Sequence, residues 1–218
     1  KKKNFFEQDK ISYGIKYDEA IEKKILTKFQ NLIITKKFED INDIIDFTSD
    51  LLKMNKIVAW FQSGSEWGPR ALGFRSIIAN PTKKSVIQEI NLSLKKRESF
   101  RPFAPSICDD DYNKYFEKNF SCNYMNYVVK VKDEIKNKIP AVVHVDGSSR
   151  AHTVREKDNQ IFYKLIKSFK NKTGICCILN TSLNINEPIC ETIEDALKTF
   201  LNSNLEYLII NKNLITKK

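Results

Sequence analysis

The sequence contains few of the residues that mark metal sites, disulfide frameworks or membrane segments. Its two histidines, His144 and His152, give a zinc ion too few partners at ligand spacing. Its five cysteines are irregularly spaced and contain no CxxC pair, which favours buried reduced thiols in a cytoplasmic protein. No apolar run approaches the ~20 residues of a membrane-spanning helix. No apolar segment follows Lys1–Lys3, as a signal peptide would require.

Arginine is also scarce, because only six of the 37 basic residues are arginine and the other 31 are lysine. The formal net charge of +10 suggests an anionic partner. The lysines are distributed along the whole sequence, as expected for the common surface cation of such a composition. All six arginines, in contrast, fall between positions 70 and 155. Since the planar guanidinium group suits bidentate binding of phosphate or carboxylate, we expect an anion site in that region.

Hydrophobic periodicity predicts one α/β domain with a mixed, partly antiparallel sheet covered by helices. The 218 residues, 41% of them hydrophobic, can bury a core without metal or disulfide bonds. Helices are expected at 18–29, 38–54, 83–94, 109–116, 159–170 and 192–202. Strands are expected at 56–62, 76–79, 102–108, 124–131, 141–145, 175–179 and 206–210. Thr192 and Asp195 have the spacing of a capping box at the last helix.

The first polar segment, residues 64–75 (GSEWGPRALGFR), holds three of the chain's six glycines. Closely spaced glycines and a proline mark an irregular loop that exposes backbone N–H groups. Arg70 and Arg75 add fixed positive charge, so this loop suits a phosphate or a carboxylate. A structural turn with two solvated arginines would explain the same residues.

The second segment, residues 95–105 (KKRESFRPFAP), places four cations within seven residues, among them Lys95, Arg97 and Arg101. Phenylalanine and proline are interleaved with these cations. A rigid, aromatic-flanked cationic strand suits an anion, a nucleotide or a nucleic-acid backbone. The alternative is a charged surface strand.

The third segment, residues 144–155 (HVDGSSRAHTVR), combines a tight turn, two hydroxyls and both histidines with Arg150 and Arg155. Polar groups this dense at a strand end are typical of a site carried on loops. The alternative for His144 is a structural role. No carboxylate–His–Ser spacing suggests a hydrolase triad here.

The fourth segment, residues 179–188 (LNTSLNINEP), follows an apolar run. Asn180, Ser182 and Asn184 alternate, so in an extended chain they point to one face. Such a row can bind phosphate oxygens, ribose or an amide. An Asn/Ser-rich turn with local side-chain caps is the alternative.

Taken together and in this order, GPRALGFRSI, KKRESFRPFAPS, HVDGSSRAHTV and LNTSLNINEPI resemble the C-terminal domain of the NodU/CmcH/TobZ-type O-carbamoyltransferases. The resemblance covers residues 10 to 215. It implies a YrdC-like fold with a largely antiparallel, twisted sheet flanked by helices, over residues 39–218. Residues 1–38 would be an extension that links this domain to a missing N-terminal ASKHA-type transfer domain. Two small departures are Asn186, where the family often has glycine, and Leu183, where phenylalanine is more usual.

The resemblance also implies an activity and a set of site residues. The domain would use carbamoyl phosphate and ATP to make carbamoyl adenylate, which the ASKHA-type domain would transfer to a hydroxyl group. The implied catalytic residues are Lys95, Arg97 and Arg101. The implied ligand-binding residues are Arg70, Arg75, His144, Arg150, Arg155, Asn180, Ser182 and Asn184. Mg²⁺ would accompany ATP, without a metal held by the domain's own side chains.

Two other functions stay open from the sequence. A YrdC-like fold with a net charge of +10 could be an RNA-binding module, although the arginine positions favour small phosphate ligands. The absence of an initial methionine also predicts a piece of a longer protein, which would bind ligands without turnover on its own. The hydroxyl acceptor is not indicated by these residues.

Overall fold

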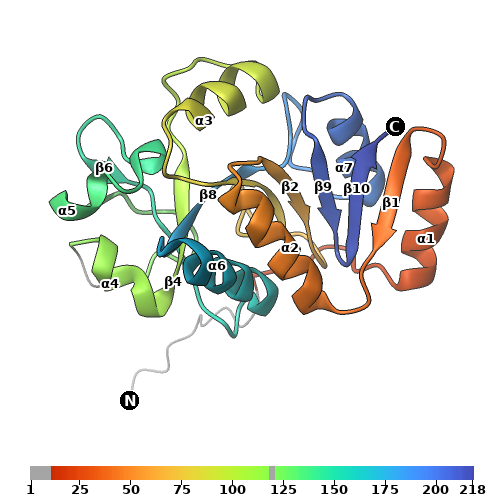
Figure 1. Ribbon diagram of the computed structural model, residues 1–218, viewed down its shortest axis with the longest axis horizontal. Coiled ribbons are helices and arrows are strands. Elements are labelled where there is room, and N and C mark those ends of the chain that lie inside the picture. The colour runs from red at the N-terminus through yellow and green to blue at the C-terminus, as the bar shows by residue number, and fades with distance from the viewer. Residues whose placement is uncertain (1–10, 118–120) are drawn as a thin grey trace.

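The computed structural model describes residues 11–117 and 121–218, which form a mixed α/β structure around one large sheet (Figure 1). The eight strands of this sheet are, in spatial order, β1 (Ile33–Lys37), β10 (Asn213–Lys217), β9 (Tyr207–Ile210), β2 (Val58–Phe61), β3 (Arg75–Ala79), β8 (Cys177–Ser182), β4 (Ala104–Cys108) and β7 (His152–Val154). Of the seven neighbouring pairs, only β2–β9 and β4–β7 are parallel. The predicted mixed, largely antiparallel sheet is therefore confirmed.

Helices cover both faces of the sheet. They are α1 (Glu19–Lys28), α2 (Ile41–Lys53), α3 (Ser85–Gln88), α4 (Tyr112–Tyr115), α5 (Asp133–Lys136), α6 (Gln160–Thr173) and α7 (Ile193–Leu201), with a π-helix at Glu89–Leu94 directly after α3. A separate two-stranded sheet pairs β5 (Val129–Lys130) with β6 (Ser148–Ser149). No helix within the described residues is long and apolar enough to cross a bilayer.

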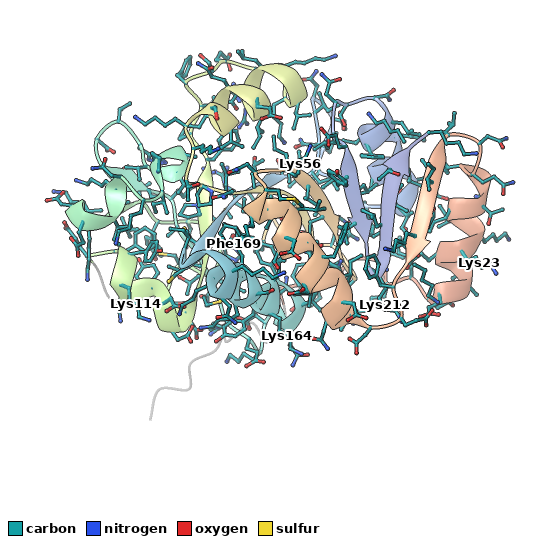
Figure 2. The ribbon with its side chains drawn as sticks, in the orientation of Figure 1. Lys23, Lys56, Lys114, Lys164, Phe169 and Lys212 are labelled. Atoms are coloured by element: carbon teal, nitrogen blue, oxygen red, sulfur yellow. The ribbon has the colours of Figure 1, made fainter. Side chains whose placement is uncertain are left out.

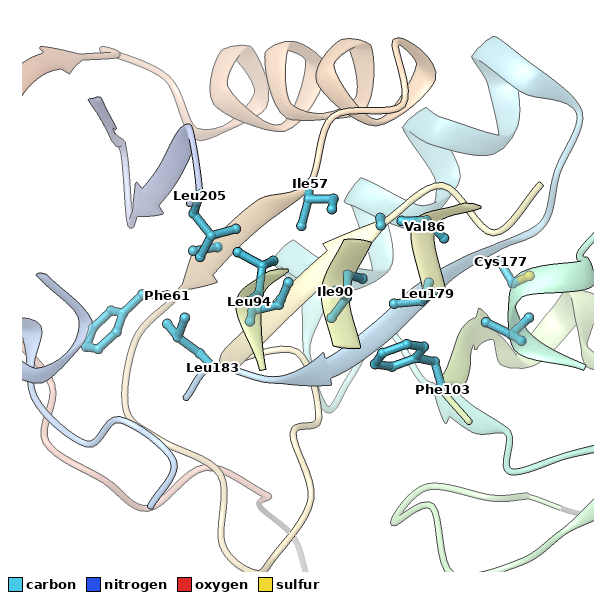
Figure 3. Packing of buried hydrophobic residues seen from close by; sticks show 14 of the residues in the cluster. Ile57, Phe61, Val86, Ile90, Leu94, Phe103, Cys177, Leu179, Leu183 and Leu205 are labelled. Carbon is cyan, nitrogen blue, oxygen red and sulfur yellow. The ribbon is translucent and has the colours of Figure 1, made fainter. Parts of the chain in front are cut away.

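Alternation along β2 shows how the strands divide the core. Val58 and Trp60 face the layer made by α2 and α6, which pack against each other in front of the sheet (Figure 1). Ala59 and Phe61 face the opposite cluster, which the π-helix and α7 cover (Figure 3). Successive side chains of a strand point to opposite faces, so a fully apolar strand needs cover on both. Leu183 also lies in the second cluster.

Lysine side chains project from the periphery of the molecule on every side in view, as Lys23, Lys114 and Lys212 illustrate, whereas Phe169 lies inside (Figure 2). Several of these lysines form exposed ion pairs with carboxylates, such as Lys212 with Glu19. Exposed pairs contribute little stability, about 0–1 kcal/mol each. The lysine background is thus a solvated surface rather than one binding face.

Most predicted elements are present, and the errors fall on short or edge elements. The strand predicted at 124–131 is reduced to β5, and the strand predicted at 141–145 is wrong, because residues Pro140–Val142 form a 3-10 turn. The sequence did not predict β1, β6, β7, β10 or α5. In β1 only Ile33 is buried, since an edge strand beside solvent carries no regular alternation.

The N-terminal part of the chain packs with the rest. α1 contacts α7, and β1 pairs with β10 over five residues. The helix predicted at 18–29 is confirmed, with Asp18 accepting a hydrogen bond from the N–H of Ile21 as its cap. The domain boundary expected after residue 38 stays a prediction.

The capping box at α7 is confirmed, because Thr192 Oγ1 accepts from the N–H of Asp195 at 3.1 Å and the Asp195 carboxylate accepts from the N–H of Thr192 at 3.0 Å. Thr192→Ala is expected to lower the free energy of unfolding by about 1 kcal/mol, because two N–H groups of the first turn lose or loosen their partners. Urea unfolding would measure it. Thr27→Ala, at an exposed position inside α1, serves as the control and should cost almost nothing. Equal effects of the two changes would contradict the prediction.

Candidate anion-binding site

The ends of four strands bring most of the predicted residues to one edge of the sheet. β8 is antiparallel to β3 and β4, so its last residue, Ser182, lies beside the first residues of those strands. β7 is parallel to β4, so the segment that enters it arrives at the same edge. Arg75 begins β3, Arg101 precedes β4 and Arg150 precedes β7. The strand order therefore gathers segments that are far apart in the sequence.

Lys95 joins two of the predicted motifs. It follows the π-helix and is only 2% exposed. Its Nζ donates hydrogen bonds to the backbone O of Ser182 at 2.5 Å, to Ser182 Oγ at 3.2 Å and to Asn184 Oδ1 at 2.7 Å. Ser182 Oγ donates to Asn184 Oδ1 as well, at 2.7 Å. The three donors of the ammonium group therefore meet three acceptors.

Two leucines anchor this arrangement to the core. Leu94 precedes Lys95, and Leu183 lies between Ser182 and Asn184; both are buried in the same hydrophobic cluster (Figure 3). Burial of each leucine fixes the direction of the polar side chains beside it. Leu183 is completely buried.

The environment of Lys95 disfavours its charge. Burial, together with the neighbouring charge of Arg97, lowers the pKa of Lys95 to about 7. Desolvation and a like charge both disfavour an ammonium ion, whereas a bound anion would favour it. The side chain is therefore placed to respond to an anionic ligand within the neutral pH range.

Arg150 lies within range of the charges of two other arginines. Burial lowers the pKa of Arg150, and the charges of Arg70 and Arg97 lower it further. Arg150 Nε is buried and has no hydrogen-bond partner among the described residues. Arg97 Nε donates to Asn91 Oδ1 at 2.7 Å, and its guanidinium lies 5.1 Å from the ring centroid of Phe103. Three like charges held together disfavour one another, so the cluster suits a polyanion.

Arg101 and His144 lie at the margin of the cluster. The exposed Arg101 forms an ion pair with Glu98, with 2.8 Å between Nε and Oε2. Burial lowers the pKa of Arg97, and the charge of Arg101 lowers it further. Burial also lowers the pKa of His144. The charge of Asp146 raises this pKa, and the charge of Arg150 lowers it. Both predicted residues are thus electrostatically coupled to arginines of the cluster.

Arg75 and Asn180 are buried in the framework beneath the site. Arg75 is 0% exposed, and its guanidinium donates to the backbone oxygens of Gln62, Ser63, Phe74 and Glu191. Asn180 Nδ2 donates to Ala71 O at 3.0 Å and to Ser106 Oγ at 2.9 Å. Both side chains therefore hold neighbouring loops in place.

Arg155 is the predicted residue that the fold does not bring to this edge. It follows the last residue of β7, at the opposite end of that strand from Arg150. Its Nε forms an ion pair with the carboxylate of Asp158, three residues along the chain.

Three polar residues at this end of the molecule were not predicted. Asn91 is fully buried in the π-helix, where its Nδ2 donates to Ser99 O at 3.2 Å and Arg101 O at 3.0 Å. Glu66 is buried inside the 64–75 loop, and His152 Nδ1 lies 2.8 Å from Ser106 Oγ. A polar residue in an apolar helical stripe could have indicated Asn91. Glu66 and His152 lie inside the first and third predicted segments, but neither was assigned to the site.

No group of three or more His, Cys, Asp or Glu residues in the described part of the chain is placed to hold a metal ion. The five cysteines are free and buried, as the sequence predicted.

Comparison with known proteins gives both a family and a fold. The family profile described as "Carbamoyltransferase C-terminus" matches residues 49–217. The nodulation protein NolNO of Sinorhizobium fredii is 38% identical over 205 residues, which cover 92% of this chain and 30% of that protein. The 3'-hydroxymethylcephem-O-carbamoyltransferase of Amycolatopsis lactamdurans is 38% identical over 141 residues, covering 65% of this chain and 26% of that enzyme. The chain thus spans about a third or less of these relatives.

Two solved structures share the fold. Full-length HypF, in a phosphate- and nucleotide-bound form, aligns with a TM-score of 0.54 at 20% identity and covers 85% of this chain and 22% of its own. Sua5 of P. abyssi, complexed with L-threonine, aligns with a TM-score of 0.54 at 15% identity and covers 77% of this chain and 46% of its own. These likenesses confirm the YrdC-like fold.

Proposed function

The chain belongs to the carbamoyltransferase C-terminus family, and from that premise we propose that it makes carbamoyl adenylate from carbamoyl phosphate and ATP. The charges of Arg70 and Arg97 act on the buried Arg150, and Arg97 also acts on Lys95; this convergence carries the proposal. Adenylation brings two polyanions together, and fixed cations reduce their repulsion. HypF, which shares the fold, has been observed with nucleotide and phosphate bound.

The proposed reaction has two parts. Water first cleaves the bond between phosphorus and the bridging oxygen of carbamoyl phosphate, which releases phosphate and a proton and leaves carbamate. A carbamate oxygen then attacks the α-phosphorus of ATP, the bond from that phosphorus to the bridging β-oxygen breaks, and pyrophosphate leaves. No side-chain nucleophile is needed, so the protein's part is positioning and charge stabilisation.

We assign the residues to roles in this reaction. Arg70 and Arg150 would bind phosphate oxygens, because their guanidinium groups form no ion pair with a carboxylate of the described residues. Arg97, fixed through Nε by Asn91, would present its other nitrogens to the charge that develops on pyrophosphate. Arg101 would add charge from the rim.

Mg²⁺ is expected to accompany ATP in phosphoryl and nucleotidyl transfer. The described residues present no carboxylate cluster that fits this ion. We therefore assign no protein ligand to Mg²⁺ and derive no step through it.

We propose that carbamoyl transfer to a hydroxyl acceptor takes place on a further, ASKHA-type domain that precedes residue 39 in the full enzyme. The curated relatives support this, because the chain spans only 30% of NolNO and 26% of the cephem carbamoyltransferase. The proposed setting is the cytoplasm, where buried thiols stay reduced.

Exchange of labelled pyrophosphate into ATP, measured with and without carbamoyl phosphate, tests the proposal. Exchange that depends on carbamoyl phosphate is the expected result. Binding of both ligands without exchange would instead identify a ligand-binding part of a longer enzyme. Absence of binding to either ligand, with salt-sensitive binding to RNA, would favour the RNA-binding function and exclude the adenylation site.

Ligand binding is expected to be accompanied by proton uptake at about pH 8, because an anion beside Lys95 favours its charged form. Titration calorimetry with ATP in buffers of different ionisation enthalpy measures this uptake as the slope of the observed enthalpy. The slope should approach zero near pH 5, where the amine of the free protein is already charged. Lys95→Met should abolish the slope, whereas the exposed neighbour Lys96→Met should retain it. An unchanged slope in Lys95→Met would assign the proton to another group.

A further inference from the structure

The loop that carries Arg70 is held by a chain segment that lies outside the family match at residues 49–217. We propose that residues Ile11–Gly14 are a clamp that positions this loop for anion binding. The inference rests on the proposed function for the role of Arg70. The position of the clamp against the loop rests on hydrogen bonds and packing alone.

The outer side of the loop is bound by backbone hydrogen bonds. The N–H of Trp67 donates to Ile11 O at 2.9 Å, and the N–H groups of Tyr13 and Gly14 donate to Ser65 O at 3.0 and 3.1 Å. Ser12 pairs with Glu66 as an isolated antiparallel bridge. The clamp thus engages successive loop residues as an added strand does.

Two glycines allow this close approach. A Cβ atom on Gly14 would meet Ser65 Oγ and would lie 2.5 Å from the backbone N of Ser65, closer than such atoms approach. A Cβ atom on Gly64 would meet the backbone O of Gly14. Ser12 Oγ donates to Gly64 O at 2.7 Å. Glycine is therefore required at position 14 for the clamp to contact the loop.

The inner side of the loop is held by Glu66. Its Oε1 accepts hydrogen bonds from the N–H groups of Leu72 at 2.5 Å, Phe74 at 3.4 Å and Arg75 at 3.3 Å. Burial raises the pKa of this carboxyl group, and the backbone N–H groups oppose that effect. The carboxylate closes the neck of the loop, while the exposed Arg70 lies at its tip.

Side-chain packing joins the clamp to the same loop. Ile11 is 5% exposed and packs in one cluster with Leu72, Phe74 and Met125. The clamp therefore contacts the loop through backbone, side chain and close glycine packing at once. A small displacement of a positioning element can cost ~10²-fold in activity, so loosening the clamp should be visible in ligand binding.

Gly14→Ala tests the clamp, with Ile15→Ala as the matched control because the Ile15 side chain is exposed. The first readout needs no ligand: Trp67 is 74% exposed on the loop, whereas the other tryptophan, Trp60, is 0% exposed. Time-resolved fluorescence anisotropy should show a larger fast component from Trp67 in Gly14→Ala and no change in Ile15→Ala.

The second readout is the Kd for ATP by calorimetry, expected to rise about 10- to 100-fold in Gly14→Ala. In an Arg70→Ala background the same change should have little further effect, because the clamp acts through Arg70. Unchanged anisotropy with unchanged affinity overturns the clamp, as does an equal loss of ATP affinity when Gly14→Ala is made in the Arg70→Ala background.

If Gly14→Ala does not fold, Ser12→Ala should give a smaller effect in the same direction, and wild-type behaviour of that variant overturns the proposal. If the wild-type chain binds no ATP, the proposed function fails and anisotropy alone decides the clamp.

Discussion

Lys95→Met is expected to reduce carbamoyl-phosphate-dependent exchange of pyrophosphate into ATP by about 10²–10³-fold, the scale for removing one charged donor from a desolvated site. The reason is geometric, because Lys95 Nζ holds both Ser182 and Asn184 through hydrogen bonds of 2.5 to 3.2 Å. Methionine has a similar length and fills the same space without donors. Initial exchange rates at saturating substrates measure the effect.

The same variant has a second signature in stability. The pKa of Lys95 is about 7 in the folded protein, below its ordinary value of 10.5 in the unfolded chain. Between these values the unfolded state binds more protons, so wild-type stability should rise with pH by a few kcal/mol relative to Lys95→Met. Urea unfolding from about pH 6 to 10 tests this. Lys96→Met is the control for both measurements, and a Lys95→Met enzyme that exchanges at the wild-type rate would remove Lys95 from the site.

Arg75→Met is expected to destabilise the fold by about 3–5 kcal/mol, the range for removing a buried charge from its partners. Four backbone oxygens accept hydrogen bonds from this guanidinium, and its centre lies 3.4 Å from the ring centroid of Phe61. Burial lowers the pKa of Arg75 to about 10, while Glu66 and Glu191 counteract that effect.

Urea midpoints at equal m-values measure the loss, and Arg75→Lys should recover only part of it because one ammonium group cannot reach four carbonyls. Arg101→Met is the matched control, since Arg101 is exposed and forms only a surface ion pair. A loss of less than about 1 kcal/mol in Arg75→Met would show that the loops are held by other contacts.

The sequence alone predicted the long, strongly periodic elements. α2 and α6 each have a continuous apolar stripe, and β2 is apolar throughout, so their patterns were unambiguous. β1 was missed because four of its five residues are exposed, and the strand is defined only by its pairing with β10. Pairing between residues near the two ends of the chain leaves no local signal.

The site was predicted in part for a similar reason. The scarcity of arginine pointed to all six arginines, and in the structure the charges of Arg70 and Arg97 act on Arg150. Arg155 shares the same sequence segment as Arg150, yet β7 separates the two at its opposite ends. Glu66 was missed because its role depends on a loop that folds back on it. The topology of the sheet determines which charged residues converge. This information is not contained in the amino-acid composition.

The position of β8 has a consequence for how the protein acquires its site. β8 lies between β3 and β4 but is made long after them, and it carries Ser182. During synthesis from the N-terminus, the edges of β3 and β4 that pair with β8 stay unpaired until residues 177–182 have been made and insert between them. The proposed nucleotide affinity should therefore arise only at the last stage of folding, so that a bound nucleotide would stabilise fully folded chains over incomplete ones.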